Sequence, residues 1–138
     1  MRLSMFGVFV VPLALMAGAC SSVYDDFPTT PDPVLVTETF TGTVTLNGAI
    51  THNFTVSTGG TTTAEITALD PSGAFIGFQM GTWSGAVCTA VLSNDAGTLA
   101  SVLAAGTQSA ASLCVKLHDP NGILVDNPVG YTVKVTHP

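Results

Sequence analysis

Short segments in which apolar and polar residues alternate run along the chain from Phe40 to its end. Phe40 and Val44 alternate with threonines, and Tyr131, Val133 and Val135 share one parity near the C-terminus. Alternation with a period of two places every second side chain on the same face of a strand, which is typical of strands buried on one side. The sequence therefore predicts an all-β domain.

Turn residues separate these segments. Asn47-Gly48 and Gly59-Gly60 predict hairpin turns, because Asn and Gly adopt positive φ at low cost. Asp70-Pro71-Ser72-Gly73 and Asp119-Pro120-Asn121-Gly122 match type I turns. Each of these two phrases has one carboxylate, which we expect to cap its own turn, whereas calcium needs about six to eight oxygen ligands.

Seven or eight short strands follow from these patterns, over residues 40–47, 53–57, 63–68, 74–80, 86–93, 111–118 and 131–136. The segment Leu99–Ala105 fits a strand or an Ala-rich helix equally well. Many short strands separated by turn residues predict an antiparallel β-sandwich with jelly-roll or Greek-key connections over residues 37–138.

The N-terminus has the pattern of an export signal. Arg2 precedes an apolar run from Met5 to Ala17, which ends in Ala17-Gly18-Ala19-Cys20. A charged residue, a short apolar core and small residues before a cleavage site are typical of a secretory signal, here residues 1–19 with their helix. The last residues also resemble the lipobox of bacterial lipoproteins, which implies that Cys20 receives the lipid. Cleavage by an ordinary signal peptidase would instead leave Cys20 as a free thiol.

Cysteine usage agrees with lipidation. The chain has three cysteines, and modification of Cys20 leaves Cys88 and Cys114 as a pair. An exported protein meets an oxidising compartment, so we expect a disulfide between them. Two buried, reduced thiols are the alternative. Since Cys114 shares parity with Lys116 and His118, we expect the bridge on the outward face of a sheet.

Residues 20–36 are predicted to be a tether behind the lipid. Prolines at positions 28, 31 and 33 and the absence of apolar periodicity favour an extended segment. Ser21 and Ser22 follow the cysteine, where inner-membrane lipoproteins of proteobacteria commonly have Asp. That resemblance implies a protein of the bacterial cell envelope, anchored to the outer membrane.

The charge of the chain excludes one class of partner. Nine acidic residues oppose three basic ones, and the acids are scattered singly. Nucleic-acid binding requires clusters of Lys and Arg, and the sequence contains no such cluster. We therefore expect no nucleic-acid partner, and we read the acids as solubilising charges.

Five segments resemble the bacterial pre-peptidase C-terminal domain: Gly42-Thr-Val-Thr-Leu, His52-Asn-Phe-Thr-Val, Thr63-Ala-Glu-Ile-Thr-Ala-Leu, Leu113-Cys-Val-Lys-Leu-His-Asp and Gly130-Tyr-Thr-Val-Lys-Val-Thr. The resemblance implies a jelly-roll-like β-sandwich that serves exported enzymes in secretion, surface retention or substrate contact without catalysis. The chain has Ile76-Gly-Phe-Gln-Met where the family has an Asp-x-Asp-Leu phrase, so no cation ligand is carried over.

Candidate catalytic groups are few. His52, His118 and His137 lie in or beside predicted strands, with no nucleophile elbow or paired-histidine motif. His118-Asp119 would need a distant serine to form a triad, and Asp25-Asp26 fall in the tether. We expect no catalytic residue, no metal and no cofactor, and hence not an enzyme.

Trp83, in Gly81-Thr-Trp-Ser-Gly85, is the best candidate for a binding contact. A tryptophan between glycines is expected on a loop, although packing in the core beside a disulfide is the alternative. Phe75 and Phe78 have opposite parity, so one of them is expected to face outward and join Trp83.

Three functions are compatible with these features. The first is a lipid-anchored, non-catalytic module that binds a protein or a glycan. The second is a structural subunit of an envelope complex that packs through an exposed strand edge, and the third is a hydrolase. The partner itself is not encoded in any motif that we can identify.

Overall fold

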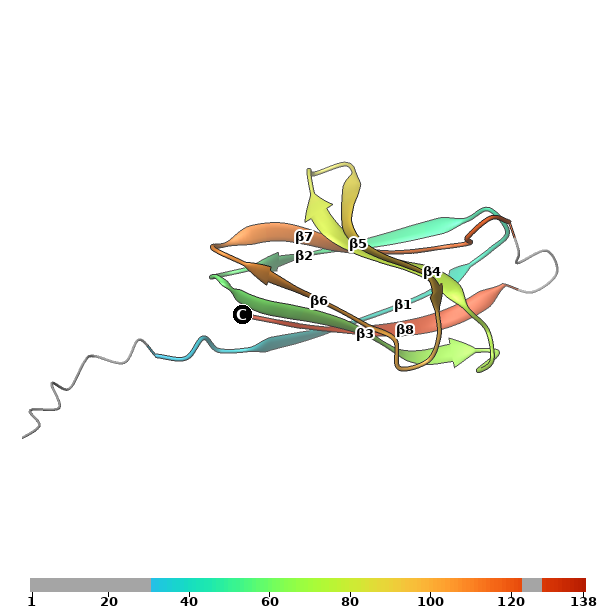
Figure 1. Cartoon of the computed structure of the whole chain (residues 1–138), viewed down its shortest axis with the longest axis horizontal. Coiled ribbons are helices and arrows are strands. Elements are labelled where there is room, and N and C mark those ends of the chain that lie inside the picture. The colour runs from blue at the N-terminus through green and yellow to red at the C-terminus, as the bar shows by residue number, and fades with distance from the viewer. Residues whose placement is uncertain (1–30, 123–127) are drawn as a thin grey trace, which may run out of the picture. The chain divides into compact units, whose positions relative to one another are not determined.

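The computed structural model describes residues 31–122 and 128–138, where eight β-strands form two antiparallel sheets (Figure 1). One sheet has the order β1 (Val36–Val44), β8 (Val129–His137), β3 (Gly60–Asp70) and β6 (Val102–Thr107). The other has the order β2 (Ala49–Val56), β7 (Ala111–His118), β4 (Ile76–Trp83) and β5 (Cys88–Gly97). The predicted all-β class is confirmed. The signal segment, Cys20 and the tether up to residue 30 lie outside the described residues.

The two sheets enclose one apolar core. The residues that share a parity along each strand are those that point into it: Ile66, Val133 and Val135 come from one sheet, and Phe78 and Leu117 come from the other. All five are fully buried. Because burial of one such side chain contributes about 1.5–3 kcal/mol, this shared core is the main reason why the sheets pack together.

The ambiguous segment Leu99–Ala105 divides into a turn and a strand. The backbone N–H of Ser101 donates to the carbonyl of Thr98, and Ala100 has a φ of 67°. Strand β6 then begins at Val102 and pairs with β3. The helical alternative is wrong, because the positive φ at Ala100 breaks any helix and the pairing with β3 takes the remaining residues.

The turn at Asn47-Gly48 is confirmed, but the hairpin that it was expected to close is not. Asn47 has a φ of 53°, and the N–H of Gly48 donates to Thr45. However, β1 pairs with β8 and β2 pairs with β7, so this turn passes the chain from one sheet to the other. The same holds at Gly59-Gly60, after which β3 joins β8 and β6. A dipeptide can reverse the chain, but it does not select the strand that pairs.

The two Asp-Pro-x-Gly phrases also differ from expectation. The N–H of Ala74 donates to Pro71, so the first turn lies one residue later than predicted. In the second phrase Asn121 and Gly122 both have a φ of 67°, which a type I turn does not contain. Asp119 accepts a hydrogen bond of 2.9 Å from the N–H of Asn47. This carboxylate therefore stabilises a turn that is distant in sequence.

Candidate functional site

The β4–β5 hairpin is the most prominent feature of the described surface. Among the described strands it is the only consecutive pair that hydrogen-bonds within one sheet, and its tip stands out from that sheet (Figure 1). The tip from Ser84 to Val87 is exposed, and Gly85 has a φ of 93° that favours glycine. The hairpin therefore presents side chains away from the core.

A glycine allows the hairpin to bend. The register of β4 and β5 shifts between Met80 and Gly81. A Cβ placed on Gly81 would overlap the carbonyl oxygen of Thr89, so the backbone of β5 approaches β4 more closely than any side chain allows. A bulge of this kind bends a strand and increases its twist.

The predicted disulfide between Cys88 and Cys114 is confirmed, and it ties the bent hairpin to the neighbouring strand β7. Cys88, the first residue of β5, is bonded to Cys114 in β7, with the two Cα atoms 5.8 Å apart. Cys114 has the opposite parity to Leu113 and Val115, which line the core, so the bridge lies on the outward face of the sheet. Cys114 is nevertheless fully buried.

Trp83 lies beside this bridge. It is the last residue of β4 and is directly opposite Cys88 in the strand register, and side chains at paired positions share one face. Trp83 is partly buried, and the core formed by the described side chains does not include it. The tryptophan is therefore held at the base of the hairpin tip and remains partly accessible.

The three candidate aromatic residues do not form one patch. Phe75 has 45% of its surface exposed, whereas Phe78 is fully buried in the core, so the proposed contact role of Phe78 is wrong. Phe75 precedes the first residue of β4 and Trp83 is the last residue of that strand. At about 3.3 Å per residue the two are roughly 25 Å apart, too far to contact one small ligand together.

An apolar cleft of about 120 Å³ opens beneath the hairpin. It lies where β4, β5 and β7 of one sheet meet β6 of the other, and its lining comprises Met80, Gly81, Thr82, Val91, Ala105, Gly106, Thr107 and Leu113. Val91 at its border has 67% of its surface exposed. The cleft can receive one aliphatic side chain.

A polar row lies on the same sheet. Gln79 donates to Ser93 at 3.3 Å, and Ser93 donates to Asp95 at 3.1 Å. Asp95 is also 3.6 Å from Nε2 of His118. The carboxylate thus lies between the serine and the histidine, whereas a Ser-His-Asp triad requires the histidine in the middle.

His118 itself is held by its surroundings. Its ring lies against Gly77, where a Cβ would overlap it. Burial lowers the pKa of His118, and Lys116 lowers it further, while Asp95 and Asp119 act in the opposite direction. Asp119, the next residue along the chain, accepts a hydrogen bond from the backbone N–H of Asn47.

The other two histidines lie between the sheets at the β1 and β2 edges. Nε2 of His52 is 2.8 Å from the hydroxyl of Tyr131, and its ring stacks on Phe40 with centroids 4.8 Å apart. Burial lowers the pKa of His52 and raises the pKa of Tyr131 to about 12. The Tyr131 hydroxyl therefore remains a neutral hydrogen-bonding group across the physiological range.

His137 is also paired. Its Nε2 is 3.0 Å from a carboxylate oxygen of Glu38, and its ring lies 5.3 Å from that of Phe54. The sequence patterns did not predict that His52 and His137 each pack against aromatic rings between the two sheets. A signal was present, because His52 shares parity with Phe54, and His137 shares parity with Val135.

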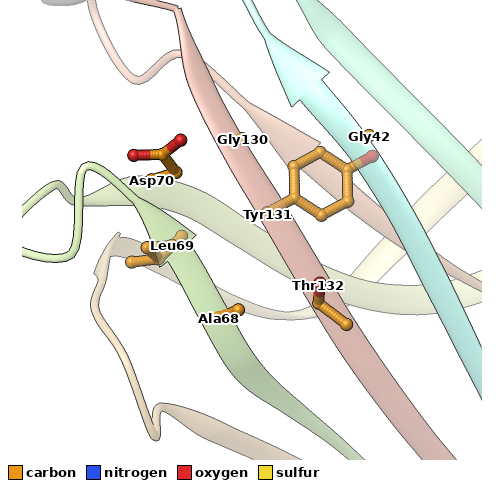
Figure 2. Close-up of a pocket in the computed structure, with 7 residues that line it drawn as sticks. All are labelled: Gly42, Ala68, Leu69, Asp70, Gly130, Tyr131 and Thr132. Atoms are coloured by element: carbon orange, nitrogen blue, oxygen red, sulfur yellow. The ribbon is translucent and has the colours of Figure 1, made fainter.

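A second hollow, of about 250 Å³, lies over β3, β8 and β1 (Figure 2). The ring of Tyr131 extends from β8 toward Gly42 of the neighbouring strand β1, where an added Cβ would be 2.5 Å from the hydroxyl oxygen. Asp70 is the one carboxylate in the lining. Across residues 31–122 and 128–138, no group of three or more His, Cys, Asp or Glu residues could hold a metal ion.

Comparison with known proteins gives no relative: no protein-family model matches the chain, and no curated protein is significantly similar to it. In the part of the chain that the structure describes, no helix is both long and apolar enough to span a bilayer.

Proposed function

We propose that this chain is a lipid-anchored, non-catalytic β-sandwich of jelly-roll or Greek-key type that binds a protein or a glycan in the bacterial cell envelope. The observation that carries the proposal is the disulfide-held β4–β5 hairpin, which presents Trp83 beside an exposed tip. The domain resembles the pre-peptidase C-terminal domain, and we propose a similar accessory role beside an exported enzyme.

The covalent chemistry supports export. A bridge between Cys88 and Cys114 forms in oxidising compartments and is rare in the cytosol. The export signal ends at Cys20, and its lipid would place the domain at a membrane surface. Ser21 after that cysteine favours the outer membrane in this proposal.

The hairpin has the properties of a binding element. A loop that is already held in one conformation loses little entropy when it binds, so more of the contact energy appears as affinity. Tryptophan is enriched among residues that dominate binding energies, because its ring offers a large contact area. The apolar cleft under the hairpin offers an adjoining pocket for a small side chain.

Trp83→Ala tests the binding role in the full-length protein. Binding is measured on a glycan array and by cross-linking to envelope proteins in cells. We expect Trp83→Ala to weaken binding by more than about 1 kcal/mol while unfolding is little changed. Phe75→Ala is the matched control, because Phe75 is exposed at the opposite end of β4 and should leave binding intact. Binding that survives Trp83→Ala would place the contact elsewhere.

Cys20→Ser tests the anchor. We expect the variant to lose metabolic labelling with fatty acid and to leave the membrane fraction. Equal membrane association of the variant and the native protein, without lipid on either, would contradict lipidation.

A further inference from the structure

The disulfide shows how the β4–β5 hairpin is placed over its own sheet. Cys88 is in β5 and Cys114 is in β7, and β4 lies between these two strands. Neighbouring strands are about 4.8 Å apart, so strands on the two sides of β4 would be separated by roughly 9.6 Å. The two Cα atoms are only 5.8 Å apart. The beginning of β5 is therefore drawn over β4 toward β7.

Gly81 allows this crossing. Its neighbour Met80 points into the core, so a Cβ on Gly81 would point to the outward face of the sheet. There it would overlap the carbonyl oxygen of Thr89 and the Cα atom of Ala90. The backbone of β5 thus passes over the outward side of β4, and the hairpin tip stands out from that side (Figure 1).

This crossing directs Trp83 toward β7 and β2. Trp83 is paired with Cys88 and shares its face, and the sulfur of Cys88 is bonded to Cys114. Cys114 in turn is directly opposite Asn53 of β2. The four residues form one continuous series, with the indole at one end, the disulfide in the middle and the Asn53 amide at the other end. The indole therefore lies on the side of the hairpin that faces β7 and β2.

The surface around the disulfide is polar. The side chains of β2 and β7 that share its face and surround it contain hydroxyl, amide and ammonium groups: Thr51, Asn53, Thr55, Ser112 and Lys116. We refer to these five side chains as the bridge face. The large apolar residues of both strands, such as Phe54 and Leu117, belong to the core. Because protein interfaces are apolar at their centre, the bridge face is a poor match for a protein partner.

A sugar ring matches both parts of this surface. One face of a pyranose ring has only C–H groups, which pack on the negatively polarised face of an aromatic ring such as that of Trp83. The hydroxyl groups of a sugar both donate and accept hydrogen bonds, as do the hydroxyl and amide groups of the bridge face. The aromatic ring and the polar side chains can therefore contact one glycan together.

Charge indicates a neutral glycan. Lys116 is the one charged residue of the bridge face, and a single cation does not hold a polyanion, which requires clustered positive charges. The chain as a whole has a formal net charge of −6, which repels acidic polymers.

We propose that Trp83 and the bridge face bind a neutral glycan, with a sugar ring stacked on the indole and neighbouring hydroxyl groups hydrogen-bonded to Asn53 and Thr55. This inference rests on the proposed binding role of Trp83 and names the class of ligand. The other sheet offers a comparison. Its aromatic residues Phe40 and Tyr131 pack on or in the core, so its outward-facing threonines have no aromatic ring beside them.

Titration calorimetry of the purified full-length protein tests this assignment. Cellohexaose, mannohexaose and chitohexaose are the neutral probes, and hexagalacturonate is the acidic probe. We expect the native protein to bind at least one neutral probe, and Asn53→Ala to weaken that binding about tenfold, as is typical when hydrogen bonds to a ligand are lost. Thr55→Ala should weaken it in the same direction. Thr41→Ala is the matched control, because Thr41 is also an exposed threonine on an edge strand, but of the other sheet.

Failure of this inference can be distinguished from failure of the proposed function. Neutral-probe binding that is unchanged in both Asn53→Ala and Thr55→Ala, with native melting temperatures, would overturn the role of the bridge face. Tighter binding of hexagalacturonate would overturn the neutral glycan, and so would capture of an envelope protein through Trp83 without binding of any neutral probe. In both of these cases the binding role of Trp83 would stand. Absence of any Trp83-dependent binding would contradict the proposed function and this inference together.

Discussion

Removal of the Cys88–Cys114 bridge should cost much of the stability of this domain. The bridge closes a segment with a sequence separation of 26. In the chain-entropy model a loop of this length restricts the unfolded chain by about 3.5 kcal/mol. Small domains have unfolding free energies of about 5–15 kcal/mol, so the bridge supplies a large part of the total. We expect the double variant Cys88→Ala/Cys114→Ala to melt at least about 10 °C below the native protein.

Urea denaturation, followed by tryptophan fluorescence and by circular dichroism, measures this effect. Trp83 is the single tryptophan and lies opposite Cys88, so its emission reports the hairpin, whereas the far-ultraviolet signal reports both sheets. A reductant should destabilise the native protein and leave the double variant unchanged, which separates the bridge from the effect of substitution. A loss below about 1 kcal/mol would refute the loop-entropy argument.

Two further predictions concern the bend at Gly81 and the partly buried His52. Gly81→Ala should destabilise the domain by about 1–3 kcal/mol in urea denaturation, because its Cβ would overlap Thr89, whereas Gly73→Ala meets no atom and should be nearly neutral. Burial lowers the pKa of His52, so its contribution to stability is present above the ordinary value of 6.5 and is lost as the pH falls below it. Between pH 7 and pH 5 the free energy of unfolding should decrease, and His52→Gln should reduce that decrease. Equal destabilisation by the two glycine variants, or an unchanged pH slope in His52→Gln, would contradict these assignments.

The positions of the candidate site residues could be predicted in two cases only. One was the face of a strand, from the alternation of side chains, and the other was the cysteine pairing, from the count of cysteines. Removing Cys20 from the count left one cysteine pair, and the parity of Cys114 predicted an outward bridge, which the structure confirms. The same reasoning showed that one of Phe75 and Phe78 faces outward. It could not show that Phe75 and Trp83 lie at opposite ends of β4, because a shared face does not imply proximity.

The sequence by itself determined three features: alternation gave the all-β class and the inward face of most strands, and the turn residues gave the places where the chain turns. All three depend on residues that are near neighbours in sequence. Tertiary structure decided which strands pair. Val36 in the first strand pairs with His137 in the last strand, although nearly the whole domain separates them in sequence. The turn at Asn47-Gly48 joins two sheets instead of closing a hairpin. The contacts of His52 with Tyr131 and of Asp95 with His118 follow from that pairing. Alternation along a strand determines only the face of the sheet on which each side chain lies. Which side chains contact it depends on how the strands pair and on how the two sheets bury their inward faces against each other.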